Sequence, residues 1–553
     1  MRAVQHLLPY LLFSLFIVFA VSLILPYSMD EFSQFSPITC LYYPNNKLNI
    51  FREACGKYDL TLSLPFLGQW ILPLRAFYYV GSLQALAYFP LFLLWESPLS
   101  ARFLGMIWLI AEAHVLSLLF PGVRRKWMFL GLIGFFFYFL MHVVDRGPIG
   151  PHFFLIYLSY WLLCEWITTL QLRYILWLSF ITVLGLWLKP TYAGPLVGVL
   201  IVGFVHFSKH FGTLFASKQS AAKFFIQLTA GVLAFGFFAA PIFLARINGG
   251  PAYYSIFREG GWMPLADVLQ GKIFAGHSWG MLWNMWHANA LGRWEPVPHP
   301  TMLSILYTLV TLLCIPGLML GLVVSRKLAF RQMVEPVAFF VIFLVVLGSV
   351  LLSTTAWAVH HLILAFPFLI LSGVSLFDVC RHALQRVWKG WYVAGCAVLL
   401  VNILAFATYF RQPIRTDDSF SRQSIHQILY DKHLSSTYLY VLVDFGMYYY
   451  QGLYGNRDQA VLFILPLDKQ EQISQLKEIA AAHHRKLLFV HQTGWSTTDK
   501  ALITSSFDLQ RCAAVPENFS WQILLEKDKS GDSPCRSAAA SAPAERTLST
   551  ILW

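Results

Sequence analysis

Two adjacent carboxylates, Asp30 and Glu31, carry the clearest chemistry in this sequence of 553 residues. They follow an apolar run long enough to span a membrane, so they would lie at a membrane surface. Adjacent carboxylates repel each other, which makes it harder for both to be ionised at once. Such a pair suits a general base that takes a proton from an acceptor hydroxyl or amine. The alternative is an acidic pair at a wetted helix end.

A second candidate is the histidine pair His360 and His361, which opens a later apolar run. Two histidines at a helix N-terminus add hydrogen-bond donors to a position that already favours anions. A lipid phosphate at headgroup depth is the ligand that this pattern predicts. The alternative is an interfacial anchor without a ligand.

A third candidate is segment 246–300, which holds five tryptophans among polar side chains. Aromatic faces can stack on sugars, while arginine and amide groups hold hydroxyl or phosphate groups. The competing interpretation is an aromatic belt at a membrane interface. The predicted substrate-binding residues in this segment are Arg258, Trp283, His287 and Arg293.

Charged residues also occur at or within the predicted spans. Arg102 and Lys189 are candidates for binding a donor phosphate, and Asp145 is a candidate for binding substrate. Lys189 could instead extend its ammonium group to the membrane interface, and Asp145 could be neutralised by the arginine that follows it. Ionisable groups inside spans are functional candidates by default. Here they are Glu112, His114 and Glu165, of which Glu165 lies near an inner span end, where a structural role is favoured.

The composition of the chain predicts the kind of structural elements that position these residues. The chain is 57% hydrophobic and 12% charged, with a mean hydropathy of +0.58. These values exclude a water-soluble enzyme, a disordered chain and a disulfide-dense secreted scaffold. They predict a mainly α, polytopic helical membrane protein. The apolar segments are 7–25, 77–95, 103–120, 128–143, 153–170, 174–189, 190–207, 224–245, 301–323, 337–353, 361–377 and 391–409.

The net charge of +12 predicts the orientation, because cytoplasmic loops carry the lysine and arginine excess. With a cytoplasmic N-terminus, the basic loops all lie inside if 77–95 does not cross, or crosses together with 62–74. The first apolar run could be a signal peptide, but its long core favours an uncleaved anchor. We therefore expect about eleven spans and an external C-terminus.

Three external regions follow from this topology. Loop 26–100 is expected to carry membrane-hugging helices, and 246–300 forms the second region, both within a transmembrane domain of residues 1–410. The third begins with a small extracytoplasmic α/β domain over 411–527, because strand-like runs there alternate with the polar helical stretch Asp468–His484. The strand-like runs are Tyr438–Val443, Ala460–Leu465, Lys486–Val490 and Trp521–Leu525. A disordered tail over 528–553 completes the chain.

Cysteine positions agree with this orientation. Cys40, Cys55, Cys512 and Cys535 fall in the external regions as two sequence-local pairs. Disulfides are plausible at those positions, and four free thiols are the alternative. No metal-binding spacing is present, so no cofactor is required, although a carboxylate-bound divalent metal stays open.

Together these motifs resemble the GT-C superfamily of membrane glycosyltransferases, and specifically protein O-mannosyltransferases and bacterial aminoarabinose (lipid A) transferases. Asp30-Glu31 with Phe35 resembles the acidic pair after the first span. Arg102-Phe-Leu resembles the Arg-Leu opening of the second span. His360-His361-Leu-Ile-Leu-Ala-Phe-Pro367 resembles the Arg-Tyr-hydrophobic-Pro stretch of the family, with His-His in place of Arg-Tyr.

The resemblance implies transfer of a hexosyl or pentosyl group from a polyprenyl-phosphate sugar to a lipid, glycan or protein, with inversion. Asp30 would be the base, and Glu31 would orient Asp30 or the acceptor. His360 and His361, helped by Arg102 or Lys189, would steady the leaving phosphate. In the family the second acidic residue opens the fourth span, whereas Asp145 precedes the span predicted here at 153.

Two other classes of function remain open. A polysaccharide ligase or polymerase would depend on Arg258, Arg293 and His287 in the large loop rather than on Asp30. A transporter would show interrupted central spans and paired halves, which the sequence does not show clearly. Membrane lipids are expected partners and nucleic acid is not. A bacterial inner membrane with a periplasmic C-terminal domain is the expected location.

Overall fold

The computed structural model divides into two compact units. One comprises residues 1–18, 78–80 and 103–409, and the other comprises 19–77, 81–102 and 410–553. The structure describes the following residues: 8–24, 34–35, 37–38, 61–63, 71–73, 75–77, 80–134, 136–145, 147–247, 263–272, 317, 319–320, 330–352, 362–380, 425, 428–430, 432–442, 453–454, 460–463, 470–492, 503–512, 515 and 521–527.

Long apolar helices make up most of the first unit. Five described helices are long and apolar enough to cross a membrane, and shorter apolar helices accompany them. The helices from the first unit, or shared by it, are α2 (Leu8–Ile24), α7 (Pro98–Leu119), α8 (Arg125–Gly134), α9 (Phe136–Val143), α10 (Ile149–Thr169), α11 (Leu172–Leu188), α12 (Ala193–Leu214), α13 (Lys218–Ile247), α15 (Leu265–Leu269), α20 (Phe330–Leu351) and α22 (Phe366–Cys380), with short 3-10 turns η2 (Pro190–Tyr192) and η3 (Ile363–Ala365).

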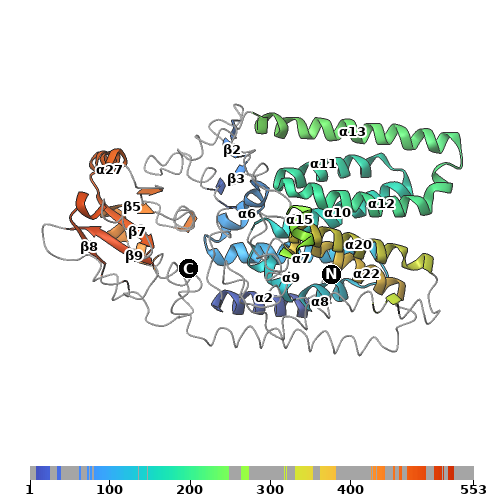
Figure 1. The fold of residues 1–553 in the computed structure, drawn as a ribbon, viewed down its shortest axis with the longest axis horizontal. Helices are drawn as coiled ribbons and strands as arrows, with labels where there is room; N and C mark the ends of the chain where they lie inside the picture. Colours follow the sequence, from blue (N-terminus) through green and yellow to red (C-terminus); the bar gives the residue numbers. More distant parts are fainter. Residues whose placement is uncertain are drawn as a thin grey trace. The chain divides into compact units, whose positions relative to one another are not determined.

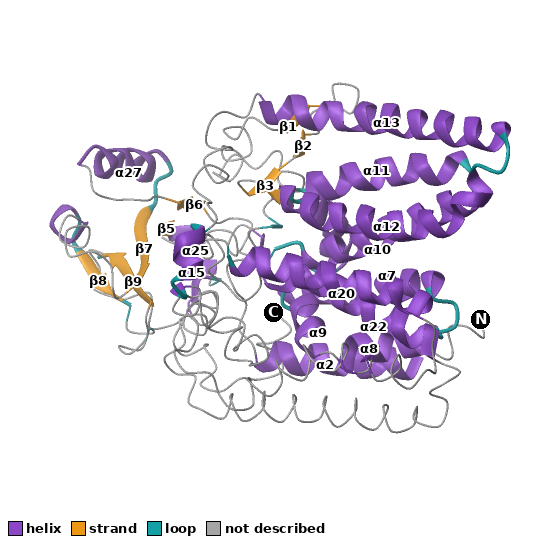
Figure 2. Ribbon diagram, turned by 45° about the vertical axis from the view of Figure 1, so that its right-hand side comes forward, coloured by secondary structure: helices purple, strands orange, loops and turns teal. Residues whose placement is uncertain are grey.

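These helices pack side by side in the order α13, α11, α10, α12, α20 and α22 (Figures 1 and 2). Glycines allow close approach at several crossings, as is usual between membrane helices. A Cβ atom at Gly203 of α12 would lie 2.2 Å from Leu163 of α10. At Gly231 of α13 it would lie 2.5 Å from Ile175 of α11. At these two crossings a glycine of one helix therefore packs against a large apolar side chain of the next.

The exposed side chains of α13, the helix at the end of this row, indicate what surrounds the bundle. Only 17% of the membrane-spanning part of α13 is buried inside the protein. Its side chains Phe237 and Leu233 are 76% and 69% exposed. Large apolar side chains on the outer surface fit a hydrocarbon surrounding rather than water. The prediction of a polytopic helical membrane protein is confirmed.

Most of the predicted spans coincide with helices where the structure describes the chain, although segment 128–143 is divided between α8 and α9. The segments 391–409 and most of 301–323 lie outside the described residues, so the count of eleven spans stays a prediction. The span predicted at 190–207 begins instead at Ala193, because Pro190–Tyr192 forms a 3-10 turn. The span predicted at 153 begins at Ile149.

Loop 26–100 contains both helix and strand. The helix α6 (Leu83–Leu94) has 12 residues, about 18 Å in length, which is short of the roughly 30 Å of a hydrocarbon core. Strands β1 (Thr61–Ser63) and β2 (Ile71–Pro73) pair antiparallel, so 62–74 does not form a second crossing helix. The short strands β3 (Arg75–Phe77) and β4 (Val80–Gly81) also pair. The expected short helix is present, and the strands were not expected.

The C-terminal region forms a five-stranded mixed sheet in the order β6-β5-β7-β9-β8. Strand β5 lies between β6 and β7 and runs parallel to both, whereas β9 runs antiparallel to β7 and β8. The elements are α25 (Lys432–Thr437), β5 (Tyr438–Leu442), β6 (Ala460–Phe463), α27 (Gln470–Ala482), β7 (Lys486–Gln492), β8 (Leu509–Arg511) and β9 (Trp521–Glu526). The fold prediction of a small α/β domain is confirmed.

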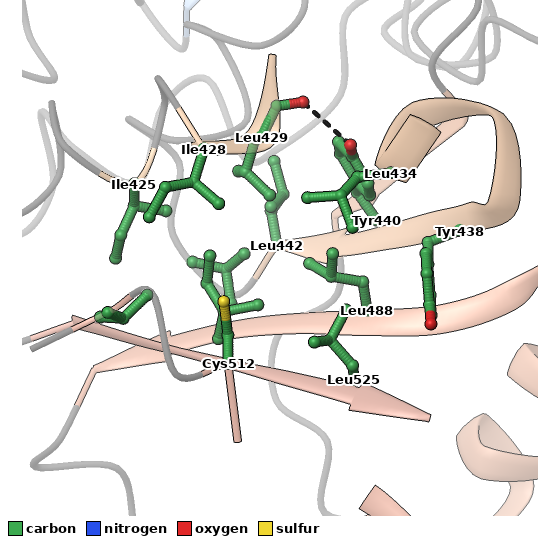
Figure 3. Packing of buried hydrophobic residues seen from close by; sticks show 13 residues of the cluster. Ile425, Ile428, Leu429, Leu434, Tyr438, Tyr440, Leu442, Leu488, Cys512 and Leu525 are labelled. Carbon is green, nitrogen blue, oxygen red and sulfur yellow. Dashed lines mark hydrogen bonds between the residues drawn. The ribbon is translucent and has the colours of Figure 1, made fainter. Parts of the chain in front are cut away.

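Alternate residues of β5 enter two separate cores, one on each face of the sheet. Tyr438, Tyr440 and Leu442 lie in one cluster with Leu488 and Cys512 (Figure 3). In that cluster the Tyr440 hydroxyl donates to the carbonyl oxygen of Leu429 at 2.9 Å. The other cluster contains Leu439, Val441, Ile473, Leu476, Ala480, Leu487, Phe489, Ile503 and Phe507. Burial on both faces explains the continuous apolar run of β5.

One cysteine prediction can be followed into this domain. Cys512 is disulfide-bonded and fully buried, and its partner lies outside the described residues. The described cysteines Cys164 and Cys380 are free. Pairing of Cys512 with Cys535 therefore stays a prediction, as does the pair Cys40 and Cys55. The tail 528–553 lies outside the described residues.

Candidate functional site

Three of the predicted site residues lie in the described part of the chain. Asp145 and Lys189 belong to the first unit, and Arg102 lies near the start of α7. The other predicted residues fall outside the described residues: Asp30, Glu31, Arg258, Trp283, His287, Arg293, His360 and His361. The site can therefore be built upward only from the segments that carry Asp145 and Lys189.

Asp145 lies in the turn that joins α9 to α10. Its side chain is 6% exposed, and its Oδ1 accepts a hydrogen bond from the backbone N–H of Ile149 at 3.0 Å. A carboxylate at this position satisfies one of the unpaired N–H groups of a helix start and complements the helix dipole. Asp145 therefore lies just before the N-cap Pro148 and accepts a hydrogen bond from the first turn of α10.

The sequence Gly-Pro-Ile-Gly-Pro was expected to delay the start of the helix to residue 153. The helix instead begins within this sequence, at Ile149. Pro148 is the N-cap and Pro151 lies in the first turn, where the missing N–H of proline costs no helical hydrogen bond. Gly147 has a φ of +122°, a conformation that favours glycine strongly. This backbone conformation lets the chain reverse between the two helices within a few residues.

Lys189 reaches the same turn from the end of α11. A Cβ atom added to Gly147 would lie 3.9 Å from the Lys189 Nζ, so the ammonium group lies over the Gly147 backbone. Lys189 is partly buried and has extended backbone geometry between α11 and η2. Two residues that are far apart in sequence, one acidic and one basic, thus share one turn.

Tyr192 holds the segment that carries Lys189 against α10. Its hydroxyl lies 2.8 Å from the Ser159 Oγ and donates to the carbonyl oxygen of Leu155 at 3.1 Å. Its ring packs over Gly185, where a Cβ atom would lie 2.4 Å from a ring carbon. The position of Lys189 is therefore fixed by packing and hydrogen bonds rather than left to a free loop.

His152 is a buried polar residue of this region that was not predicted from the sequence. It is 1% exposed, and neither ring nitrogen has a hydrogen-bond partner within the structure as described. Its ring meets the edge of the Tyr192 ring at 5.3 Å, and the charge of Lys189 acts on it. Histidine in the first turn of an apolar span is a signal that could have found it.

Arg102 has a different setting from Lys189. It is among the largest fully buried side chains, at 1% exposure. A guanidinium group is almost never buried without partners, so its charge is held within the protein. Its predicted role in phosphate binding stays a prediction.

Within the described residues, no group of three or more His, Cys, Asp or Glu side chains could hold a metal ion. The adjacent pair Asp30 and Glu31, the strongest carboxylate candidate in the sequence, lies outside that part. The arrangement that the structure does show is one buried carboxylate and one lysine ammonium at a helix start. It can bind a ligand that presents both hydroxyl groups and negative charge.

Fold and site together define a polytopic helical membrane protein with a charged turn between two packed helices and a separate α/β domain. No protein-family model matches the sequence, and no curated protein matches it.

Two solved structures of ArnT from Cupriavidus metallidurans are similar to this chain. The apo structure has 10% sequence identity and a TM-score of 0.45, covering 97% of this chain and 100% of ArnT. The structure bound to undecaprenyl phosphate has 11% identity and a TM-score of 0.47, covering 96% and 99%. At this level of similarity, a function has to be supported by the chain's own residues.

Proposed function

We propose that this chain is a GT-C-type membrane glycosyltransferase that uses a polyprenyl-phosphate sugar as donor and acts on the extracytoplasmic face. The observation that supports this most is that Asp145 and Lys189 both lie at the turn before α10, where Asp145 accepts from the Ile149 N–H and the Lys189 ammonium group lies over Gly147. A donor of this class offers sugar hydroxyls and a phosphate close together, which matches one carboxylate and one ammonium group.

The proposed reaction is a single inverting displacement. The acceptor hydroxyl or amine gives its proton to Asp30 while it attacks the anomeric carbon of the sugar. The bond from that carbon to the phosphate oxygen breaks, and its electron pair stays on the polyprenyl phosphate. Glu31 orients the acceptor or Asp30. Lys189, with His360, His361 and Arg102, stabilises the negative charge of the leaving phosphate.

The remaining predicted residues bind substrate in this proposal. Asp145 accepts hydrogen bonds from sugar hydroxyls, and Arg258, Trp283, His287 and Arg293 hold the acceptor or the sugar in the loop 246–300. The acceptor class is a lipid, a glycan or a protein. The reaction needs no cofactor, since all proton and charge changes fall on side chains and substrates.

The disulfide of Cys512 supports the extracytoplasmic location of the C-terminal domain. Disulfides persist in oxidising compartments and are rare in the cytosol, where thiols are kept reduced. A disulfide in the α/β domain therefore favours the orientation that the basic loops predict, with the C-terminal domain in the periplasm of a bacterial inner membrane.

The test is a transfer assay in proteoliposomes with a panel of labelled undecaprenyl-phosphate sugars. We expect Lys189→Gln to raise the donor KM about 10-fold or more, because it removes a charge-assisted hydrogen bond. Asp145→Asn should lower kcat/KM by about 10-fold to 100-fold. Asp508→Asn, a 75%-exposed carboxylate paired with Lys527 on the α/β domain, is the matched control and should have no effect.

The rival ligase class predicts a different pattern in the same assay. Loss of activity in Arg258→Ala, Arg293→Ala and His287→Ala, with full activity in Asp30→Asn, would favour a ligase or polymerase. Absence of transfer from every polyprenyl-phosphate sugar, by a correctly inserted chain, would count against the proposed donor class.

A further inference from the structure

We propose that Glu112 and His142 are positioning residues that hold Asp145 in place through the end of α9. The inference deepens the proposed function, because it rests on Asp145 as a substrate-binding residue. It starts from a buried polar network between α7, α9 and α10, in a part of the bundle where polar groups are costly unless paired.

All four side chains of this network are fully buried: Glu112, Tyr138, His142 and Tyr157 each have 0% exposure. His142 Nε2 lies 2.7 Å from Glu112 Oε1, and the Tyr138 hydroxyl donates to Glu112 Oε2 at 2.5 Å. The Tyr138 and Tyr157 hydroxyls are 2.9 Å apart. Both oxygens of the Glu112 carboxyl group are therefore engaged.

The direction of three of the four hydrogen bonds in this network can be assigned. His142 Nδ1 lies 2.8 Å from the carbonyl oxygen of Tyr138, which can only accept, so Nδ1 carries a hydrogen. Because the Tyr138 hydrogen points to Glu112, the Tyr157 hydroxyl must donate to Tyr138. A single shared hydrogen then joins His142 Nε2 to Glu112. A fully satisfied buried network of this kind holds its members in one geometry.

This network is one part of a clamp that a single face of α7 places on the α9–α10 turn. Gly105, Trp108 and Glu112 are spaced three and four residues apart and so share that face. A Cβ atom at Gly105 would lie 1.8 Å from the His142 carbonyl oxygen. A Cβ atom at Gly150 would lie 2.9 Å from Trp108. The α7 face thus contacts the chain on both sides of the turn.

Asp145 lies between these two anchors. It follows His142 by three residues, its charge acts on the His142 ring, and its Oδ1 accepts from the Ile149 N–H on the other side. The direction of the Asp145 carboxylate is therefore set from α7 through His142. A displacement of about 1 Å at a substrate-binding group is enough to lower turnover about 100-fold.

The first test measures position without requiring activity. Glu112→Leu keeps about the size of the side chain and removes both hydrogen-bonding oxygens, and hydrogen exchange followed by mass spectrometry reports the Ile149 amide that Asp145 caps. We expect that amide to exchange at least about 10-fold faster in the variant. The matched control is Glu335→Leu, because Glu335 also accepts a tyrosine hydroxyl of α10, that of Tyr160 at 2.7 Å.

The second test measures coupling. In the transfer assay, Glu112→Leu should lower kcat/KM by no more than Asp145→Asn does, that is by about 10-fold to 100-fold. The double variant Glu112→Leu/Asp145→Asn should be no slower than Asp145→Asn alone. If Glu112→Leu does not fold, Tyr157→Phe replaces it, with Tyr160→Phe as its control.

Unchanged exchange at Ile149, or additive losses in the double variant, would overturn the positioning role. Absence of transfer by the parent chain would instead overturn the proposed function, and the exchange experiment would still decide whether Glu112 holds the turn.

Discussion

The helical bundle and the C-terminal α/β domain differ in which side chains they expose and which they bury. In the bundle, α13 leaves Phe237 and Leu233 largely exposed, while Glu112 and His142 are fully buried. In the α/β domain, Leu439 and Leu488 are fully buried on opposite faces of the sheet. The hydrophobic effect stabilises the second arrangement in water, whereas close packing and hydrogen bonds stabilise the first in lipid.

The difference teaches where each region is vulnerable. The bundle should fail where helices approach closely or where buried polar groups lose a partner. The α/β domain should fail where buried apolar volume is removed. The following changes test that division in order of decreasing effect.

The largest effect is expected at Gly105, because the atom that obstructs a larger side chain there belongs to the His142 backbone. Gly105→Leu should prevent the bundle from folding, since a backbone contact cannot be relieved by a rotamer change. Size-exclusion profiles in detergent give the measurement. Gly236→Leu on α13, where no atom lies within 4 Å of an added Cβ, should give the parent profile. A monodisperse Gly105→Leu protein would contradict the packing described.

The next effect compares the same truncation in both regions. Leu488→Ala removes a fully buried side chain and should lower the free energy of unfolding of the α/β domain by about 2–5 kcal/mol. Leu233→Ala on α13, where the side chain is 69% exposed, should change stability by less than about 0.5 kcal/mol in lipid. Chemical unfolding of the full chain in nanodiscs measures both. Equal losses would remove the distinction between the regions.

The disulfide of Cys512 should have an effect of similar or smaller size. Cys512→Ser is expected to lower the stability of the α/β domain by about 2–4 kcal/mol, because the unfolded chain regains freedom. Thermal unfolding of the full chain measures this. Cys164→Ser, at a free cysteine of the bundle, is the control. Maleimide labelling of denatured, unreduced protein at Cys512 would show that the bond is not formed.

The smallest effect is expected at the ion pair between Lys209 and Glu335, which lies 2.8 Å apart with side chains 42% and 20% exposed. Exposed pairs contribute little, because water and salt screen them. Lys209→Gln should change the free energy of unfolding by less than about 1 kcal/mol in the same nanodisc measurement. A loss as large as that of Leu488→Ala would show that the bundle depends on this pair.

Sequence patterns predicted the α/β domain in some detail. The runs at Tyr438, Ala460, Lys486 and Trp521 each begin a strand, and the polar helix predicted at 468–484 spans Gln470–Ala482. These elements are long enough to show their periodicity. Strand β8 was missed, because Leu509–Arg511 has three residues and two of them are polar.

The candidate site was predicted in part. Asp145 and Lys189 were singled out from their positions at span ends, but nothing in the sequence indicated that they share one turn. Their position at one turn depends on Tyr192 packing over Gly185 and on the positive φ of Gly147, both of which are features of the folded chain. His142 lies inside one predicted apolar segment and His152 immediately before another, so the rule that selected His114 could have found both.

The central claim is that Asp30 takes the acceptor proton during sugar transfer from a polyprenyl phosphate. The most direct measurement compares the initial rate of labelled-sugar transfer by Asp30→Asn with that of the parent, in proteoliposomes with matched amounts of inserted protein. Loss of a general base predicts a rate at least about 100-fold lower. A rate within a few-fold of the parent would contradict the claim.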